Sequence, residues 1–298
     1  EHRNFIKAAE ACFVTQPTLS MQMKKLEDEL GVLIFDRGKQ PIVPTSIGSK
    51  IIHQARTIYR ETGQIENILR DFKGDISGSL KIGVLPTIAN ALIPKLVREV
   101  SENHPDLKLT IKEGLTHEII EDLEHDRLDV GIVSTPVKHN GLVERNLYNE
   151  KFRIYAHPDH PSFSKKAWEA TDLLEDKLWL LSEGNCFRVQ TINLCSLPDE
   201  KLNHLALTYE SGSLQTLKKI VDFEGGTTII PEWEASELDD NSLDNLRAFR
   251  ADDAGRAVGL IYTKFYAKDK VINRLEEMIV NCLPRYVAEN KDLKIIES

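Results

Sequence analysis

The most informative segment of the chain lies near its start, where residues 15–31 read TQPTLSMQMKKLEDELG. Thr15 is placed to cap a helix, and Pro17 falls in the first turn, where its missing N–H costs nothing. Apolar residues then recur at spacings of three and four, and Gly31 suits the end of a helix. A short alanine-rich helical pattern over residues 5–12 precedes this segment. Two helices joined by a tight turn predict a helix-turn-helix.

The following residues extend this pattern. Residues 35–45 read FDRGKQPIVPT, which predicts a small β-hairpin, the wing. From Thr45 to about Phe72 the apolar residues keep a one-sided helical spacing, which is typical of a dimerising linker helix. We therefore expect a winged helix-turn-helix domain over residues 1–45 and a linker helix over residues 46–75. Because the chain has no initiator Met and starts inside a helical pattern, we expect a short native N-terminal piece to be missing.

Beyond residue 78, strand-like and helix-like segments alternate. We expect strands over residues 79–85, 107–113, 129–133, 151–156, 177–181, 205–209, 227–230 and 257–262, and helices over residues 92–103, 116–125, 214–221 and 269–282. This alternation predicts an α/β domain with a parallel sheet and helices on both faces. The polar tail, residues 291–298, is expected to fray.

Composition limits the class of protein. A chain of 298 residues with 41% hydrophobic and 29% charged residues fits a globular protein of two or three compact units. No apolar run reaches the length of a membrane span and no signal segment is present, so we expect a cytoplasmic protein without membrane contact. Four cysteines are too few for a stapled secreted fold, and any disulfide is expected to be transient.

The charge is unevenly distributed. The net charge is −9, but residues 1–60 hold nine Lys and Arg against six Asp and Glu, and the remainder holds 29 against 41. A mildly basic head on an acidic body is compatible with DNA binding by the head alone.

The head resembles LysR-type transcriptional regulators. The resemblance rests on Ala8-Ala9, on residues 14–20 (VTQPTLS), 26–31 (LEDELG) and 35–37 (FDR), and on Thr45 and Gly48. It implies a regulator that acts as a homodimer or homotetramer, with double-stranded promoter DNA and RNA polymerase as partners. The remainder is similar to the family's effector domain, a two-lobed fold like periplasmic solute-binding proteins. With crossings near Glu150 and Arg256, the regulatory domain over residues 78–298 divides into lobe I, residues 78–150 and 257–298, and lobe II, residues 151–256.

A second segment narrows the resemblance. Residues 183–195 read EGNCFRVQTINLC, which is similar to the redox loop of peroxide-responsive regulators in that family. Residues 85–87 (LPT), 114–117 (GLTH) and 255–260 (GRAVGL) are similar as well. The resemblance implies that Cys186 reacts with hydrogen peroxide, that Cys195 resolves the product as a reversible disulfide, and that Thr87, Thr116 and Arg256 surround Cys186. Asn185 and Val189 depart from the family's usual His and Asp, which puts the reaction rate of Cys186 in question.

The expected chemistry requires a thiolate, whereas an ordinary cysteine has a pKa near 8.5. Asn185 is suited to cap a helix that starts at Cys186, where N–H groups and the helix dipole favour negative charge. With Arg256 as a nearby cation, this predicts a lowered pKa for Cys186. A helix from Cys186 to Cys195 would span about 13–14 Å, but a disulfide needs Cα atoms within about 7 Å, so closing the bond would unwind it. Thr116 has a second interpretation, as a cap for the helix over residues 118–124.

The predicted recognition helix offers candidate DNA ligands. Gln16, Thr18, Ser20 and Gln22 can bond to base edges or phosphates, and Lys24, Arg37 and Lys39 are candidate phosphate contacts. Lys25 and the run Glu27–Glu29 are interpreted as a solvated face.

Other functions remain as alternatives. The main one is a LysR-type regulator that binds a small effector in the cleft between its lobes, with the cysteines incidental. A thiol peroxidase and a free solute-binding protein both conflict with a DNA-binding head, so no enzyme activity is expected. Cys12 and Cys282 are interpreted as structural. We expect no cofactor and no metal, because a C-x8-C pair without a neighbouring His pair does not build a zinc site.

Overall fold

The computed structural model describes residues 2–39, 41–52, 54–55, 58, 62, 78–196, 213–250, 254–264, 269–290 and 293–298. The chain forms two compact units, residues 1–75 and residues 76–298. Within these described ranges, no helix has the length and apolar character that crossing a membrane requires.

The first unit contains the predicted helix-turn-helix. Helix α1 spans Phe5–Ala11 and helix α2 spans Gln16–Leu30. Thr15 caps α2 by accepting the N–H of Thr18 on its hydroxyl, and the helix ends at Gly31, whose φ of +68° lies in the left-handed region. The caps expected from the sequence are therefore confirmed.

A hairpin follows the two helices. Strands β1 (Phe35–Asp36) and β2 (Val43–Pro44) pair antiparallel, as the wing prediction requires. Residues 46–52 are helical, which agrees with the start of the predicted linker helix. Most of that predicted helix beyond residue 52 lies outside the described residues.

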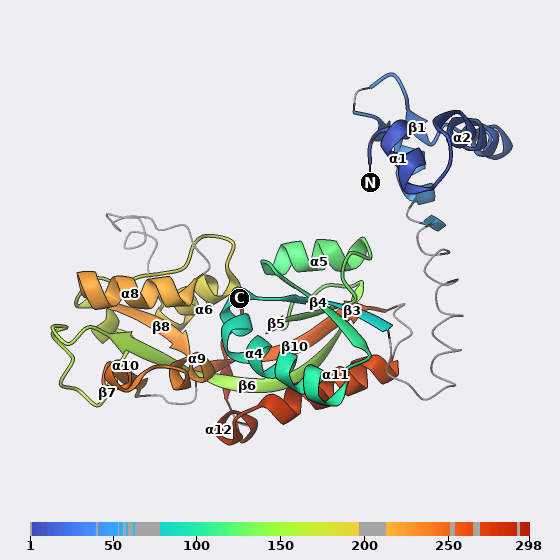
Figure 1. Cartoon of the computed structure of the whole chain (residues 1–298). Helices are drawn as coiled ribbons and strands as arrows, with labels where there is room; N and C mark the ends of the chain where they lie inside the picture. Colours follow the sequence, from blue (N-terminus) through green and yellow to red (C-terminus); the bar gives the residue numbers. More distant parts are fainter. Residues whose placement is uncertain are drawn as a thin grey trace. The chain divides into compact units, whose positions relative to one another are not determined.

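The second unit is built on one sheet, whose strand order is β4-β3-β5-β10-β6-β9-β7, with β11 added to β10 and β8 to β6. The strands are β3 (Gly78–Val84), β4 (Leu107–Glu113), β5 (Val130–Thr135), β6 (Leu142–Ala156), β7 (Ala167–Trp168), β8 (Thr227–Pro231), β9 (Leu246–Phe249), β10 (Ala254–Thr263) and β11 (Lys294–Ile295). The expectation of a parallel sheet is wrong for its centre: β10 runs antiparallel to β5 and β6, and β6 runs antiparallel to β8 and β9. The reason is that β6 carries the chain out of one lobe and β10 brings it back (Figure 1).

Helices cover this sheet. They are α4 (Pro86–Asn103), α5 (Thr116–Glu124), the 3-10 turn η1 (Asp172–Leu174), α6 (Cys186–Cys195), α8 (Leu214–Glu224), α9 (Glu232–Ser236), α10 (Asp240–Leu243), α11 (Asp269–Cys282) and α12 (Arg285–Ala288). Of the strands predicted between residues 177 and 209, residues 177–181 form only a bridge from Leu178 to Thr227, and residues 205–209 lie outside the described part.

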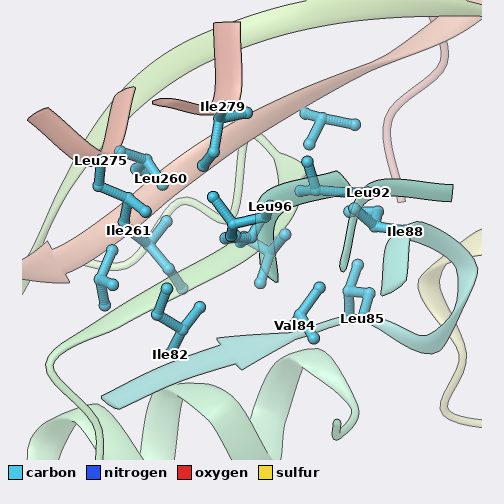
Figure 2. Packing of buried hydrophobic residues seen from close by; sticks show 14 of the residues in the cluster. Ile82, Val84, Leu85, Ile88, Leu92, Leu96, Leu260, Ile261, Leu275 and Ile279 are labelled. Atoms are coloured by element: carbon cyan, nitrogen blue, oxygen red, sulfur yellow. The ribbon is translucent and has the colours of Figure 1, made fainter. Parts of the chain in front are cut away.

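Two separate hydrophobic cores define two lobes. The lobe I core gathers apolar side chains mainly of β3, α4, β10 and α11. Figure 2 labels Ile82, Val84, Leu85, Ile88, Leu92, Leu96, Leu260, Ile261, Leu275 and Ile279 among them. The lobe II core is formed largely by β6, β8 and α8, with Phe152, Ile229 and Leu217 among its members. Burial of these side chains supplies the main stabilisation of each lobe.

Strands β6 and β10 join the lobes. The residues expected as a separate strand, 151–156, are the second half of β6, which contributes Tyr148 to one core and Phe152 to the other. In the β6–β10 ladder Glu150 stands opposite Arg256. The strands approach closely at Gly255, where a Cβ atom would lie 2.2 Å from the carbonyl oxygen of Glu150 and 2.9 Å from Leu293. Only glycine fits at this position.

The C-terminal tail is ordered rather than frayed. Strand β11 pairs parallel with β10 at Ala254 and Gly255, and the Ile296 side chain packs against the lobe II core. The expectation of a frayed tail is therefore wrong for residues 293–298. A polar composition did not reveal a pairing partner some forty residues earlier in the chain.

Candidate functional site

The site is centred on the start of helix α6. Gly184 has a φ of +81°, a conformation that suits glycine, and turns the chain into the helix. Asn185 then caps α6, as the sequence predicts: its Oδ1 accepts the N–H of Phe187 at 3.0 Å. Cys186 is thus the first helical residue, where N–H groups without helical partners point toward its side chain.

The Cys186 thiol is buried at the boundary between the lobes. Its side chain packs with the lobe I core, whereas the next residue, Phe187, packs with the lobe II core. The guanidinium of Arg256 lies 5.2 Å from the centre of the Phe187 ring and acts electrostatically on the thiol. Residues from both lobes therefore meet around this sulfur.

Arg256 is completely buried and held by hydrogen bonds. It donates from Nε to Glu150 Oε1 at 2.9 Å, from Nη1 to the Thr87 hydroxyl at 2.8 Å, and from Nη2 to the Thr87 carbonyl oxygen at 2.8 Å. Its Nη2 also lies 2.8 Å from Glu150 Oε1 in an ion pair. A guanidinium has five N–H groups, so these bonds leave one on Nη1 for another acceptor. The predicted residues Thr87 and Arg256 are thus brought together with a carboxylate.

The pKa of Cys186 differs from the sequence-based expectation. Burial is the largest influence and raises the pKa of the thiol, while Arg256, the Thr116 hydroxyl and the N–H groups of Phe187 and Cys186 itself lower it. The effect of burial exceeds the combined effect of these groups, so the pKa of Cys186 lies above its ordinary value. The prediction of a lowered pKa is therefore wrong for this conformation, because desolvation does not show in a sequence.

Thr116 contributes an unsatisfied hydroxyl. It is the first residue of α5, and the residue at the cap position is Leu115, whose N–H donates to the Glu118 carboxylate at 2.8 Å. The interpretation of Thr116 as a cap is therefore not supported. Its Oγ1 is buried and makes no well-directed hydrogen bond with any described residue, although it lies close enough to Cys186 to lower the thiol pKa. A buried hydroxyl without a partner is costly unless a ligand completes it.

The second cysteine lies at the far end of the same helix. Cys195 is the last residue of α6 and packs with the lobe II core. Burial raises its pKa to about 12, so it is protonated near neutral pH. At 1.5 Å per residue, nine steps of helix separate the two Cα atoms by about 13.5 Å. Cys186 and Cys195 are both free thiols, as are the exposed Cys12 and the half-buried Cys282.

The structure adds residues to which sequence analysis gave no role. Glu150 is the counter-ion of Arg256, and Gln190 donates from Nε2 to the Ser134 hydroxyl at 2.9 Å. The sequence held a signal for each of these two residues. A buried arginine needs an acidic partner, and Gln190 lies four residues after Cys186, on the same helix face. Ser134 carried no such signal. Val189, the other departure from the family pattern, is 39% exposed on α6.

The candidate DNA ligands divide into two groups. Gln16, Gln22 and Lys24 are exposed along α2. The others make intramolecular contacts: Thr18 bonds to Thr15, Arg37 donates to Ser20 and Glu27, and Lys39 pairs with Asp36.

Glu27 is a structural residue, contrary to its interpretation as part of a solvated face. It is buried, and its carboxylate accepts the N–H groups of Ile34 and Phe35 at 2.8 and 3.1 Å and the Arg37 guanidinium at 2.9 Å. Burial opposes ionisation, but these donors outweigh it and lower the pKa of Glu27. Glu27 therefore connects the recognition helix α2 to the start of the wing through these hydrogen bonds. Lys25 and Glu29 are exposed, as expected.

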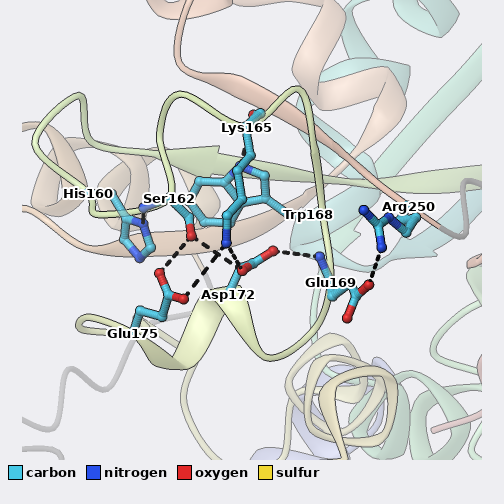
Figure 3. Close-up of polar contacts among 8 residues, drawn as sticks. All are labelled: His160, Ser162, Lys165, Trp168, Glu169, Asp172, Glu175 and Arg250. Carbon is cyan, nitrogen blue, oxygen red and sulfur yellow. Dashed lines mark hydrogen bonds and ion pairs between the residues drawn. The ribbon is translucent and has the colours of Figure 1, made fainter.

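A second polar cluster, in lobe II, has residue types found in hydrolase sites (Figure 3). The Ser162 hydroxyl, however, donates to Glu175 at 2.6 Å, and His160 Nδ1 accepts the backbone N–H of Ser162 at 3.1 Å. The histidine ring lies against Trp168, with centroids 4.5 Å apart. Because His160 does not reach the hydroxyl, it cannot activate Ser162 as a nucleophile. Among the described residues, no group of three His, Cys, Asp or Glu side chains is arranged to hold a metal ion.

Comparison with known proteins identifies the family. A family model described as the LysR substrate binding domain matches residues 73–282, and one described as the bacterial regulatory helix-turn-helix protein of the lysR family matches residues 1–49. The chain belongs to the LysR family. It is therefore a DNA-binding transcriptional regulator, and the resemblance seen in the sequence is confirmed.

Relatives of known name narrow the comparison. The hydrogen peroxide-inducible genes activator of Haemophilus influenzae is 33% identical over 232 residues, which cover 78% of this chain and 76% of the relative. The DNA-binding transcriptional dual regulator OxyR of Escherichia coli K12 is 32% identical over 233 residues, which cover 78% and 75%. A solved structure of a full-length OxyR variant from Pseudomonas aeruginosa superposes with a TM-score of 0.76 at 32% identity and covers 96% of this chain and 94% of that one.

Proposed function

We propose that this LysR-family regulator senses hydrogen peroxide through Cys186 and records the signal as a disulfide between Cys186 and Cys195. Hydrogen peroxide is supported as the signal by the similarity to a hydrogen peroxide-inducible genes activator and to OxyR. The observation that carries the mechanism is the placement of the thiols: Cys186 begins α6 beside Arg256 and the buried Thr116 hydroxyl, and Cys195 ends the same helix.

The first step is a two-electron oxidation of Cys186. The thiolate sulfur attacks one oxygen of hydrogen peroxide, an S–O bond forms, the O–O bond breaks, and the leaving hydroxide takes a proton to become water. The Thr87 hydroxyl accepts from Arg256, so its own proton is available to a peroxide oxygen. The Thr116 hydroxyl and the remaining N–H of Arg256 are the other donors that can stabilise charge on the leaving oxygen.

The second step joins the two sulfurs. The Cys195 sulfur attacks the sulfenic sulfur of Cys186, an S–S bond forms, the S–O bond breaks, and water leaves. Because the two Cα atoms must approach from about 13.5 Å to within about 7 Å, α6 has to unwind first. A thiol reductant returns two electrons and two protons to restore the helical form.

We assign residues 1–45 to DNA binding, residues 46–75 to a dimerising linker, and residues 78–298 to sensing, with lobe I at 78–150 and 257–298 and lobe II at 151–256. Gln16, Thr18, Ser20, Gln22, Lys24, Arg37 and Lys39 are the proposed promoter contacts. Ile47 and Ile58 in the linker are 43% and 58% exposed, which supports pairing with a second copy in a homodimer or homotetramer. RNA polymerase is the proposed partner at the promoter.

We further propose that the chain is a cytoplasmic sensor rather than a peroxidase. Disulfide formation requires α6 to unwind, and reduction requires α6 to form again. Such a cycle suits a regulatory switch better than an enzyme that consumes peroxide rapidly.

The test is mass spectrometry of the reduced protein before and after one equivalent of hydrogen peroxide. We expect a Cys186–Cys195 linkage, with Cys12 and Cys282 remaining free. In cells, Cys186→Ser should abolish peroxide-dependent transcription, whereas Cys282→Ser should preserve it. If Cys186→Ser leaves the response unchanged, the chain responds instead to an effector bound between its lobes.

A further inference from the structure

The C-terminal tail lies against the redox helix. Strand β11 is held on β10 by parallel pairing, and the Ile296 N–H donates to the Gly255 carbonyl oxygen at 2.8 Å. In Figure 1 the C-terminus lies beside α6, between the two lobes. The tail is therefore anchored independently of α6, on the strand that carries Arg256.

Two side chains of α6 bond to the backbone of this tail. Gln190 donates from Nε2 to the Ile296 carbonyl oxygen at 2.9 Å, and Asn193 donates from Nδ2 to the Glu297 carbonyl oxygen at 3.0 Å. Gln190 is almost fully buried and also reaches Ser134 of β5. Both donors lie between the two cysteines, in the part of the helix that must move.

These bonds are incompatible with the disulfide. Bringing the Cα atoms of Cys186 and Cys195 within about 7 Å removes residues 187–194 from their helical positions. Gln190 and Asn193 then lose the tail carbonyls to which they donate. The Gln190 side chain is buried and its bond to Ile296 is partly buried, so breaking this bond leaves poorly hydrated polar groups without partners.

We propose that the C-terminal strand is part of the sensor: Ile296 and Glu297 hold α6 in its reduced conformation through Gln190 and Asn193, and so set how readily Cys195 reaches oxidised Cys186. This inference rests on the proposed function, in which that disulfide is the signal. The tail acts as a positioning element, because its bonds to α6 go to Gln190 and Asn193 and not to the Cys186 thiol.

A surface ion pair provides a control within the tail. The Glu297 carboxylate lies 2.5 Å from Lys138 Nζ, and both side chains are more than half exposed. Glu297→Gln removes this pair and keeps the backbone carbonyl that Asn193 uses. A chain ending at Ile295 keeps β11 and removes both carbonyl-bearing residues.

The experiment measures opening of α6 in the reduced full-length protein, without peroxide. The labelling rate of Cys195 by N-ethylmaleimide is followed by mass spectrometry, with the exposed Cys12 as an internal reference. We expect about a tenfold increase in Cys195 labelling for the chain ending at Ile295, a smaller increase for Asn193→Ala, and no change for Glu297→Gln. After peroxide, the shortened chain should also form the disulfide several times faster than the complete chain.

The outcomes are separable. If Cys195 in the shortened chain is labelled at the rate of the complete chain, the tail does not hold α6 and the inference is wrong. If shortening unfolds the regulatory domain, seen as a lost thermal transition, Asn193→Ala decides the question because it leaves the tail intact. A complete chain that forms no disulfide with peroxide contradicts the proposed function, while the labelling result still reports on the tail.

Discussion

Cys186 and Cys195 are the first and last residues of one ten-residue helix, and their side chains pack into the cores of different lobes. Joining the sulfurs therefore withdraws at least one of them from its core and breaks the helix between them. Oxidation of Cys186 followed by disulfide formation therefore requires a change in the conformation of α6. Switches work by such coupling of a local change to an element with two arrangements.

The stability of α6 should control the second oxidation step. Val189 is partly exposed on this helix, so it can be replaced without disturbing a core. Glycine costs a helix about 1 kcal/mol relative to alanine, which corresponds to about a fivefold change in an equilibrium. Val189→Gly should form the disulfide about five times faster than Val189→Ala, while sulfenic acid forms at the same rate in both. Quenched-flow mass spectrometry measures the two steps, and equal disulfide rates would show that the helix does not limit resolution.

The reaction of Cys186 with peroxide should depend steeply on pH. Burial raises the pKa of the thiol, and only the thiolate attacks. Below that pKa, each unit of pH increases the thiolate fraction about tenfold, so the rate should rise throughout pH 6 to 8 without a plateau. Trapping of the sulfenic acid with dimedone in a Cys195→Ser variant measures this rate. A plateau beginning below pH 7 would mean that the thiol is acidic in solution.

Glu150 should restrain the reactivity of Cys186, because it neutralises the cation beside it. Glu150→Gln removes this negative charge and keeps an acceptor oxygen for Arg256, so the pKa of Cys186 should fall and its oxidation at pH 7 should become up to about tenfold faster. The variant should also be less stable, because an unpaired buried charge costs about 3–5 kcal/mol. Asp122→Asn is the matched control: Asp122 is a buried partner of Lys112 and Arg127 in lobe I. It should lose stability without shifting the pH profile of Cys186.

In the DNA-binding head, Lys24 and Glu27 should affect binding in different ways. Lys24→Ala should leave the melting temperature unchanged and reduce the slope of log affinity against log salt by about 1, the effect of one lost phosphate contact. Glu27→Ala should destabilise the head by about 1.5–3 kcal/mol for each charge-assisted hydrogen bond lost, and weaken DNA binding through misplacement of the wing. Fluorescence anisotropy with promoter DNA from 50 to 200 mM salt, beside circular dichroism melting, distinguishes these effects. An unchanged salt slope for Lys24→Ala would exclude it as a phosphate ligand.

Features set by neighbouring residues could be predicted from the sequence. The caps at Thr15 and Asn185, the left-handed Gly31 and the bounds of α11 all follow from residue types within a few positions. Features that depend on distant residues could not. Burial reversed the expected shift in the pKa of Cys186 and turned Glu27 from a solvated residue into a structural one, and long-range pairing ordered a tail that looked unstructured. A buried arginine needs an acidic partner, but the sequence did not show which residue supplies it, because Glu150 is 106 residues away from Arg256 along the chain.

Gly255 limits which substitutions this regulator can accept during evolution. A Cβ atom at this position would meet both the Glu150 carbonyl oxygen and the side chain of the tail residue Leu293, and the Gly255 carbonyl oxygen accepts the Ile296 N–H. Any larger residue there would disturb the charge environment of the thiol and the anchorage of the tail together. Mutations that change the peroxide concentration needed for oxidation, and keep the protein folded, must therefore arise at other positions. At those positions a substitution affects either the charges around Cys186 or the pairing of the tail with β10, but not both.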